Sequence, residues 1–363
     1  MNVTSKRGLL RYRGLLVRNE SALAGLILVS GVVAALALPS FRTSENLNTI
    51  LNEAASVAVV AIGEAIVIIG RQIDLSVGAI LGLCAYLVGS FVGHLHGVTS
   101  PLVGVALALA LGAALGLTNA LLIERVRMPA IIATLATLSI YSGAQVLVAN
   151  GSQIYLSQLP AWLASLEATS WAGVGSFIWI ALATLVLASL LMRLTRFGRD
   201  LYAMGSNPEA AEYLGLRSSY RLYQAFAVCG ALAGVGGLMY AGEYGNIDAT
   251  AGQGFELTVI AAAVVGGVSL FGGSGTPLGA VLGALLLTEI ENMLALLKIS
   301  IFAQQTLQGV AIVLAVAVYA VVSRRLRRPT RRHALAERPL ADVGIFDHAI
   351  GAYHVTARSG TGD

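Results

Sequence analysis

Long apolar segments separated by short polar ones run through most of this chain, and they constrain its fold more than any other feature. Ten of these segments are close to the roughly 20 residues that a helix needs to cross a bilayer. They lie near residues 22–38, 47–70, 75–93, 101–123, 129–149, 175–192, 222–241, 256–271, 276–297 and 304–322. Because a helix pairs its own backbone groups in lipid, we predict an all-α polytopic membrane protein with about ten transmembrane helices.

Composition supports this class and separates the chain into three regions. Only 12% of the 363 residues are charged, compared with about 25% in a soluble domain, and the mean hydropathy is +0.78. We therefore expect a transmembrane domain at residues 22–322, after a basic cytoplasmic N-terminus at 1–21. Residues 323–363 are rich in Arg, Pro, His and Gly and are predicted to be a mostly disordered cytoplasmic tail.

The distribution of positive charge predicts the orientation. If the N-terminus is cytoplasmic and the ten spans alternate, the cytoplasmic segments hold all of the 23 lysines and arginines except Arg42 and Lys298. Adding or removing one span would scatter these charges, so the positive-inside rule favours a multi-pass protein of the bacterial inner membrane with both ends in the cytoplasm. The basic patches are thereby explained as topology signals, and no nucleic-acid partner is expected.

The first apolar segment could also be interpreted as a cleavable signal peptide. It follows a basic leader, and Ala35-Leu36-Ala37 resembles a cleavage site. We favour an uncleaved helix, because the apolar run is long and Pro39 would stand just after the cut.

Several classes of enzyme are excluded by missing residues. A P-loop requires a lysine after a glycine-rich turn, but Lys6 and Lys298 are the two lysines and neither follows a glycine. There is no His-x-x-x-His pair, no Gly-x-Ser-x-Gly elbow and no Cys/His metal spacing. We therefore expect no enzyme activity, no bound metal and no cofactor, and any ATP must be hydrolysed by another polypeptide.

Polar residues inside the apolar segments are candidate functional residues, since a charge in hydrocarbon is costly unless it faces protein or water. Arg71 and Asp74 interrupt one long apolar run. We favour an ion pair between them that fixes a re-entrant turn, and the alternative is an element of a translocation pathway. The other polar residues at such positions are Glu53, Glu64, Asn119, Glu256, Glu289 and Glu291.

Glycines mark a second interruption of the apolar pattern. Gly266-Gly267 and Gly272-Gly273 predict a break where backbone lines protein or a water-filled cavity. Farther along, Gly279-Ala-Val-Leu-Gly283 resembles Gly78-Ala-Ile-Leu-Gly82 at an offset of 201 residues. This match indicates a possible internal repeat, with residues 47–149 and 222–322 as its halves, although five residues can also match by chance.

A basic segment at residues 193–221 carries the motif Glu209-Ala210-Ala211 followed by Gly215. Glycine is the usual residue just past a helix end, so a short Glu/Ala-rich helix is predicted to stop at Gly215. Such a string in a cytoplasmic loop is similar to the coupling loop of ATP-binding-cassette (ABC) importer permeases. Other motifs extend the similarity in the same order from about residue 47 to 322. They are Ile73-Asp74-Leu75-Ser76-Val77-Gly78, Pro129 to Leu135, Phe197-Gly198-Arg199, Ala203-Met-Gly205-Ser-Asn207 and Glu256 to Gly273.

Together these motifs resemble the ribose-type monosaccharide permeases of ABC importers. Much of that family has Gly-Gly where this chain has Arg71-Gln72, which is more similar to the autoinducer-2 and rhamnose branches. The resemblance implies a permease that moves a sugar or sugar-like solute, driven by ATP hydrolysis in a separate subunit. It also implies three partners: an ABC ATPase, a periplasmic solute-binding protein and a second permease subunit, identical or different.

The resemblance assigns roles to the candidate residues. It implies an ATPase-coupling loop that contains Arg199, Asn207, Glu209, Ala210, Ala211 and Gly215. It implies translocation-pathway or helix-break roles for Arg71, Asp74, Ser76, Gly78, Asn119, Thr134, Glu256, Gly266, Gly267, Gly272 and Gly273. The alternative is an ion-coupled secondary transporter that works alone through a carboxylate such as Glu64 or Glu289. A membrane enzyme is a weaker alternative, since no catalytic constellation is present.

Overall fold

The computed structural model describes residues 3–94, 100–300, 302, 303, 306, 309, 310 and 313, with side chains from Glu20 onward. The chain divides into two units, Met1–Val318 and Tyr319–Asp363. The second unit, and with it the predicted disordered tail, lies outside the described residues.

Helices dominate the described residues, as predicted, and eight of them are long and apolar enough to cross a membrane. The crossing part of α1 is Glu20–Ala37, at the end of a longer helix that begins at Val3. The helices are α1 (Val3–Ala37), α2 (Ser44–Ile69), α3 (Val77–His94), α4 (Pro101–Glu124), α5 (Ala130–Ala149), α7 (Ser176–Leu194), α10 (Ser218–Tyr244) and α12 (Pro277–Leu296). The chain is therefore a polytopic membrane protein.

Two of the ten predicted spans are not among these eight long helices. The segment predicted at 256–271 contains a helix of only 11 residues, α11 (Phe255–Val265), which is about 16 Å long and reaches across about half of a bilayer. Gly266 ends this helix, and Gly267 has a positive φ of 88°. The segment predicted at 304–322 lies almost entirely outside the described residues.

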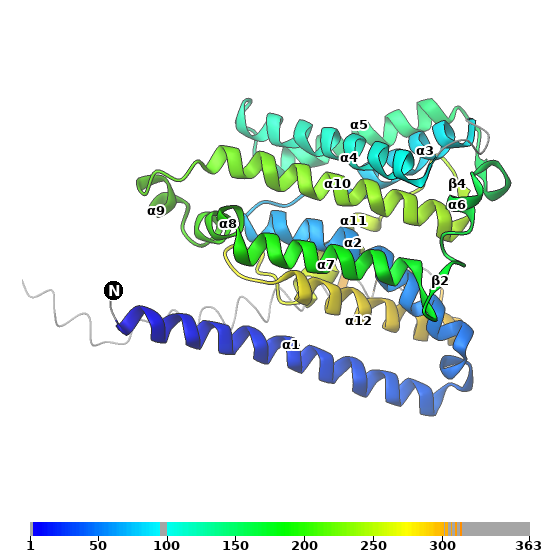
Figure 1. Ribbon diagram of the computed structural model, residues 1–363, viewed down its shortest axis with the longest axis horizontal. Coiled ribbons are helices and arrows are strands. Elements are labelled where there is room, and N and C mark those ends of the chain that lie inside the picture. Colours follow the sequence, from blue (N-terminus) through cyan, green and yellow to red (C-terminus); the bar gives the residue numbers. More distant parts are fainter. Residues whose placement is uncertain are drawn as a thin grey trace, which may run out of the picture. The chain divides into compact units, whose positions relative to one another are not determined.

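Short polar elements join the long helices at both ends. At one end lie α8 (Arg196–Ser206) and α9 (Pro208–Tyr213), close to the beginning of α10 (Figure 1). At the other end lie α6 (Ala161–Ala164), the 3-10 helices η1 (Pro39–Arg42) and η2 (Leu156–Gln158), and two antiparallel strand pairs. The pairs are β1 (Ile154–Tyr155) with β4 (Asn246–Ile247), and β2 (Ser170–Trp171) with β3 (Val174–Gly175).

Hydroxyl side chains cap several helix starts, which explains why the apolar helices begin where they do. Thr43 accepts a hydrogen bond from the Asn46 N–H at the start of α2, and Ser100 accepts one from Leu102 at the start of α4. Thr276 accepts one from Gly279 at the start of α12, where Pro277 is the first helical residue. Side-chain caps satisfy backbone N–H groups that the helix itself leaves unpaired.

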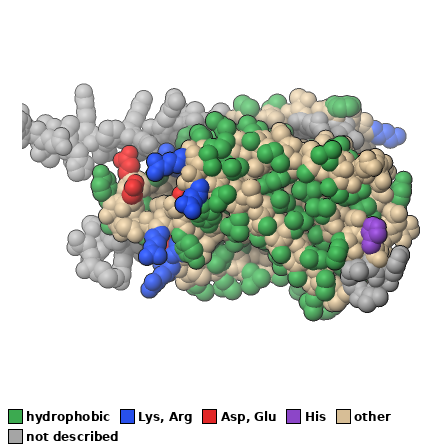
Figure 2. Space-filling model, turned by 90° about the horizontal axis from the view of Figure 1, so that it is seen from above, with side chains coloured by type: hydrophobic (Ala, Val, Ile, Leu, Met, Phe, Trp, Pro, Cys, Tyr) green, Lys and Arg blue, Asp and Glu red, His purple; other side chains and the backbone are tan. Residues whose placement is uncertain are grey.

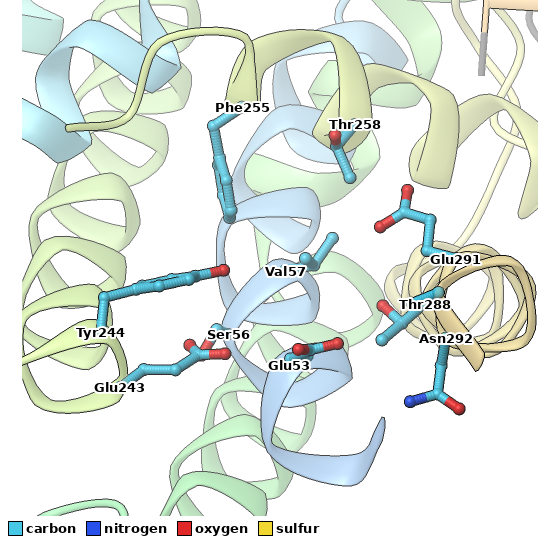
Figure 3. A pocket seen from close by; sticks show the side chains of 11 residues that line it. Glu53, Ser56, Val57, Glu243, Tyr244, Phe255, Thr258, Thr288, Glu291 and Asn292 are labelled. Carbon is cyan, nitrogen blue, oxygen red and sulfur yellow. The ribbon is translucent and has the colours of Figure 1, made fainter. Parts of the chain in front are cut away.

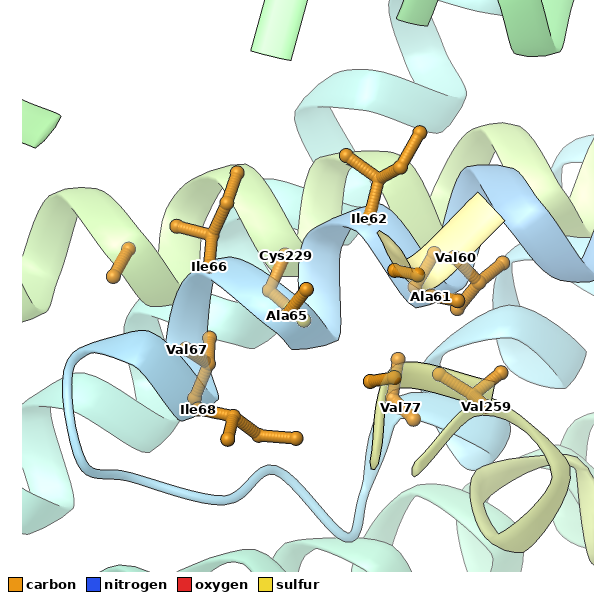
Figure 4. Packing of buried hydrophobic residues seen from close by; sticks show 14 of the residues in the cluster. Val60, Ala61, Ile62, Ala65, Ile66, Val67, Ile68, Val77, Cys229 and Val259 are labelled. Carbon is orange, nitrogen blue, oxygen red and sulfur yellow. The ribbon is translucent and has the colours of Figure 1, made fainter. Parts of the chain in front are cut away.

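Helix α2 is the centre of the bundle and is buried along most of its length. Its side chains pack against α3, α10 and α11, represented in Figure 4 by Val77, Cys229 and Val259. A helix that is apolar on all sides is expected to be buried in this way. The largest hydrophobic cluster of the described residues is built around α2, and it also includes side chains of α8 and α12.

Glycines allow α4 and α10 to pack with their backbones in contact. A Cβ atom on Gly112 would overlap the carbonyl oxygen of Gly230, and one on Gly230 would overlap the carbonyl oxygen of Gly112. Gly116 faces Phe226 in the same way, and Gly234 faces Ala108. Small residues at such a contact are typical of membrane helices, whose association depends on close packing.

This contact predicts that Gly112→Val is strongly destabilising. The new side chain would push α4 away from α10, and overpacking of this kind costs about 1–3 kcal/mol or more. We expect a lower melting temperature and less monodisperse protein in detergent, measured by size-exclusion chromatography of a fluorescent fusion. Gly143→Val on α5 is the matched control, because no atom lies within 4 Å of a Cβ at Gly143. Equal stability of the two variants would contradict the packing argument.

Candidate functional site

A group of polar side chains is fully buried where the chain turns between α2 and α3. The carboxylate oxygen Oδ1 of Asp74 accepts hydrogen bonds from the Ser76 N–H at 2.9 Å and from the Ser76 hydroxyl at 2.7 Å. Nδ2 of Asn119, on α4, donates to both oxygens of Asp74 at 3.2 Å and to Ser76 Oγ at 2.8 Å. These three predicted candidates therefore form one network, and each is 0% exposed.

Three further contacts tie this turn to other helices. Oε1 of Glu64, a buried residue of α2, accepts a hydrogen bond from the Asp74 N–H at 3.1 Å. Cys229 Sγ on α10 lies 3.8 Å from Glu64 Oε2 in donating geometry. Thr134 Oγ1 on α5 lies 3.4 Å from the carbonyl oxygen of Ile73. The turn is therefore held by α2, α4, α5 and α10 together.

The predicted ion pair between Arg71 and Asp74 is wrong. Among the described residues no ion pair joins these two side chains, and the described ion pair is the one between Arg221 and Asp200. Arg71 is exposed and has a φ of 66°, directly after the end of α2. The chain then turns inward, so that Asp74 is buried while Arg71 remains at the surface. Hydrogen-bond donors from Ser76 and Asn119 take the role that had been assigned to the arginine.

The glycine pairs that suggested a repeat pack on opposite ends of α11. On α3, Gly78 lies against Gly252 and Glu256, and a Cβ on Gly82 would overlap the Ala251 carbonyl oxygen. Glu256 is thus brought to the start of α3. The segment before α11 is not helical, so its backbone is covered by the neighbouring helix α3, as non-helical backbone at membrane depth requires.

On α12, Gly279 and Gly283 make the corresponding close contacts with the other end of α11. Gly279 packs against Gly266, and Gly283 packs against Ala262. At the offset of 201 residues, α3 corresponds in sequence to α12, and the end of α2 corresponds to the region of α11. Both glycine pairs therefore begin a helix that follows a break and make room for the backbone of α11.

The second predicted break lies between α11 and α12. Gly272 and Gly273 have φ values of 79° and 72°, which side chains with a Cβ rarely adopt. The Gly273 N–H donates a hydrogen bond of 2.9 Å to the carbonyl oxygen of Ile69, the last residue of α2. The two breaks of the chain therefore meet, one from each half of the sequence.

The predicted coupling loop folds as the two helices α8 and α9. Asn207 stands between them and accepts a hydrogen bond from the Ala210 N–H at 3.1 Å, and Pro208 is the first residue of α9. At the other end Gly215 has a φ of 72°. Its N–H donates to Glu212 O, and the N–H of residue 216 donates to Ala211 O. This is a Schellman ending, so the predicted helix stop at Gly215 is confirmed.

Helix α9 presents an unusual surface for a polar loop. Tyr213 is 92% exposed and Leu214 is 79% exposed, whereas Ala211 is buried. Glu209, Ala210 and Arg199 are also exposed. Figure 2 shows lysine and arginine side chains gathered mainly toward this end of the unit, while hydrophobic side chains cover its middle. The end with α8 and α9 is thus marked by both positive charge and exposed apolar side chains.

Helix α8 contacts both breaks. The Tyr202 hydroxyl donates to the carbonyl oxygen of Gly275 at 2.7 Å, and the Ser206 hydroxyl lies 3.4 Å from that of Gly273. Gly205 packs directly on the carbonyl oxygen of Ile69 and on Gly273. A displacement of α8 would therefore press on the end of α2 and on the glycine-rich segment before α12.

A polar cavity of about 270 Å³ lies between α2, α10, α11 and α12. Figure 3 shows its side chains, which come from all four helices and point toward one another. Its carboxylates belong to Glu53, Glu243 and Glu291. Its other polar and aromatic residues are Ser56, Thr258, Thr288, Asn292, Tyr244 and Phe255. The cavity is near the end of α10, and so toward the end of the unit opposite to α8 and α9 (Figure 1).

Comparison with known proteins identifies the family of this chain. Residues 46–316 match the family described as the permease component of the branched-chain amino acid transport system. The chain belongs to this permease family. It is a membrane permease of an ABC import system and not an enzyme.

Relatives of the permease resemble it over most of both chains. The autoinducer 2 import system permease protein LsrC of Salmonella typhimurium is 36% identical over 85% of this chain and 89% of its own. The protein of the same name from Escherichia coli is 35% identical over 86% of this chain and 92% of its own. The protein of the same name from Klebsiella pneumoniae is 37% identical over 88% of this chain and 91% of its own. No solved structure shows significant similarity to the permease.

Some residues of these sites escaped the sequence analysis. Tyr202 and Ser206 looked like ordinary loop residues, and no spacing revealed that they reach the glycine-rich break. Glu243 stands at the end of an apolar run, where carboxylates are usually solvated, so the sequence does not distinguish it from a surface residue. Its helical position relative to Tyr240 and Tyr244 gave no sign of the cavity. Glu64, and the cavity carboxylates Glu53 and Glu291, were identified from the sequence as intramembrane candidates, but the sequence did not show what they contact.

The buried network predicts that Asp74→Ala destabilises the permease. The substitution would leave the Ser76 N–H and the Ser76 hydroxyl without their acceptor, and Asn119 Nδ2 would keep only Ser76 Oγ. The cost is about 1–3 kcal/mol for each donor that finds no other partner. We expect reduced membrane insertion and a lower melting temperature in detergent. Asp74→Asn keeps one acceptor oxygen, so its melting temperature should lie between those of the wild type and Asp74→Ala. The control is Glu45→Ala, at an exposed position of α2. Normal yield and stability of Asp74→Ala would show that the Asp74 network does not stabilise the permease.

Proposed function

We propose that this permease imports a sugar-like solute and that α8 and α9 receive force from a separate ABC ATPase. The observation that carries the proposal is that α8 contacts both helix breaks through Tyr202, Gly205 and Ser206. A push on this helix would reach the ends of two transmembrane segments at once. A lever of this kind is useful only if a partner outside the membrane moves it.

The exposed surface of α9 supports an ATPase as that partner. Tyr213 and Leu214 are large apolar side chains that would be buried in a cleft of the partner, and Arg199 can contribute charge at the rim. Aromatic anchors of this kind supply much of the energy of protein interfaces. The Arg221–Asp200 ion pair, at 2.7 Å, braces α8 against the start of α10.

The proposed solute is a neutral sugar-like compound. The named relatives are permeases of autoinducer 2 import systems, and the sequence resembles monosaccharide permeases. The family description names branched-chain amino acid transport, which makes an amino acid the second candidate. An ion-coupled transporter is disfavoured because the permease belongs to a family of import-system subunits.

The proposed cycle requires three partners and a fixed orientation. A periplasmic binding protein would deliver the solute to the end of the permease that carries η1, α6 and the strand pairs. A second permease subunit would complete the path, and ATP binding in the ATPase would move α8. Residues 1–21, the coupling loop 193–221 and the tail 323–363 would lie in the cytoplasm, in agreement with their positive charge.

Orientation can be measured by cysteine labelling from each side of the membrane. Ser157 and Ser219 are both exposed and lie at opposite ends of the unit, and the native Cys84 and Cys229 are buried. We expect a membrane-impermeant thiol reagent added to spheroplasts to label Ser157→Cys. Ser219→Cys should react only after the membrane is permeabilised. The reverse pattern at either position would overturn the proposed orientation.

The coupling role predicts that Gly215→Val separates folding from transport. A β-branched residue at a φ of 72° is strained by about 1 kcal/mol or more, which would distort the end of α9 without affecting the membrane core. We expect the variant to insert normally but to bind the ATPase about fivefold more weakly and to lose ATP-driven uptake. The measurements are co-purification in detergent and uptake into proteoliposomes with all partners present.

The matched control is Gly151→Val. Gly151 has a φ of 74° and open space around it, as Gly215 has, but it lies at the end away from α8 and α9. It should be equally strained and should retain the ATPase. If Gly215→Val keeps both the ATPase and uptake, the coupling role is wrong. Transport by the wild-type permease in proteoliposomes without any ATPase would refute the importer mechanism as a whole.

A further inference from the structure

We propose that the cavity between α2, α10, α11 and α12 is a solute-binding site of the permease that selects neutral, polyhydroxylated solutes over anionic and zwitterionic ones. This inference rests on the import function proposed above and adds the site within this chain and the chemistry of its selectivity. The cavity has three features that point to such a ligand.

The first feature is unused hydrogen-bonding capacity inside the cavity. Thr288 is only 2% exposed and lines the cavity, yet its hydroxyl has no hydrogen-bond partner in the described part of the chain. Thr137 is a contrasting case, since it is 1% exposed and its hydroxyl donates to Ala133 O at 3.2 Å. The Thr288 hydroxyl is therefore available to a ligand in the cavity that can both donate and accept hydrogen bonds.

The second feature is the sign of the charge. Glu53, Glu243 and Glu291 line the cavity together, and none of its lining residues is a lysine, arginine or histidine. Glu243 already accepts a hydrogen bond from Ser56 at 2.7 Å, which holds this carboxylate in place. Solute hydroxyls can donate to these oxygens in strong charge-assisted bonds. A phosphate or carboxylate on the solute would find acidic side chains and no basic partner in the cavity, and this disfavours anions and the carboxylate end of an amino acid.

The third feature is the combination of shape and aromatic surface. Tyr244 and Phe255 face the cavity from α10 and α11, and Figure 3 shows them on the side away from Glu291 and Asn292. A sugar ring has an apolar C–H face and a polar rim of hydroxyls. Its C–H face can pack against the aromatic rings while its hydroxyls donate to the carboxylates. The volume of about 270 Å³ lies just below the range for drug-sized ligands and suits a small solute.

The position of the cavity relates it to the proposed transport cycle. Phe255 and Thr258 stand on α11, whose far end is Val265, directly before the glycine-rich break. Thr288 and Glu291 stand on α12, which starts on the other side of that break. A movement of the break would therefore shift two of the four walls of the cavity relative to α2 and α10.

The test uses a reporter cysteine in the full-length permease in detergent, so that neither the ATPase nor the binding protein is needed. Thr258→Cys places the reporter in the cavity, and Ser40→Cys in η1 is the exposed control at the same end. The rate of labelling by cationic and anionic thiosulfonate reagents of similar size is measured for each. A cleft lined by one sign of charge concentrates the opposite ion, so we expect roughly tenfold faster reaction with the cationic reagent at Thr258→Cys.

Charge removal provides the first control of this result. Glu53→Gln with Glu243→Gln in the reporter background should abolish most of the preference for the cationic reagent, whereas Glu45→Gln, at an exposed position of the same helix α2, should keep it. Equal rates for both reagents at Thr258→Cys would overturn the electrostatic selectivity.

Protection by added solutes identifies the ligand class. We expect ribose, as a neutral polyol, to slow labelling at Thr258→Cys severalfold at concentrations of tens of millimolar, and ribose 5-phosphate and leucine to have no effect. Ser40→Cys should be unaffected by all three. Protection by leucine, or by the amine putrescine but not by ribose, would overturn the proposed class. Thr288→Val should weaken protection by ribose, while the matched Thr137→Val should not.

The outcomes distinguish this inference from the proposed function. ATP-driven uptake by the complete system without any protection by ribose would reject the cavity as the site and leave the importer intact. Protection by ribose without ATP-driven uptake would reject the coupling mechanism and leave the binding site.

Discussion

The turn between α2 and α3 depends on one carboxylate, and the inner part of the unit is built around it. Backbone that is not helical at membrane depth must find hydrogen-bond partners within the protein, because lipid offers none. At this turn Asp74 accepts from Ser76 and Asn119, and its own N–H reaches Glu64. The central helix α2 can therefore end inside the bundle, and α3 can begin without exposing polar backbone to lipid. The tight glycine contacts of α3 with α11 follow from this geometry.

The second break is linked to the first through backbone contacts. The Gly273 N–H bonds to Ile69 at the end of α2, and α8 rests on both. Packed interfaces of this kind have discrete arrangements and do not deform continuously, so a push on α8 would be expected to shift whole helices. Only a small helix with a glycine at position 205 can come so close to two other backbones. Helix α8, which is proposed above to couple to an ATPase, is therefore also part of the packing of the membrane domain.

The two ends of the unit differ in their chemistry. The end with α8 and α9 carries most of the exposed arginines, whereas the cavity toward the opposite end is lined by carboxylates and hydroxyls. Hydrophobic side chains cover the surface between them (Figure 2). This separation suits a protein that meets a partner on one side of a membrane and a hydroxylated solute on the other. It also explains why net charge alone, which is +4, says little about the solute.

The class of the protein, eight of its spans, the two breaks and the stop of α9 at Gly215 could all be predicted from the sequence. Hydrophobic length, charge and glycine placement act locally and can be read along the chain. Tertiary structure decided which residues meet. Arg71 and Asp74 are three residues apart, but the chain turns inward between them, so depth separates the charges and Asn119 becomes the partner. The short length of α11 likewise depended on packing. An apolar run does not reveal where its helical part ends, and here the flanking non-helical backbone packs against glycines of α3 and α12. The cavity around Glu243 required α2 to pack against the three consecutive helices α10, α11 and α12 near the other end of the sequence, and no local pattern could reveal it.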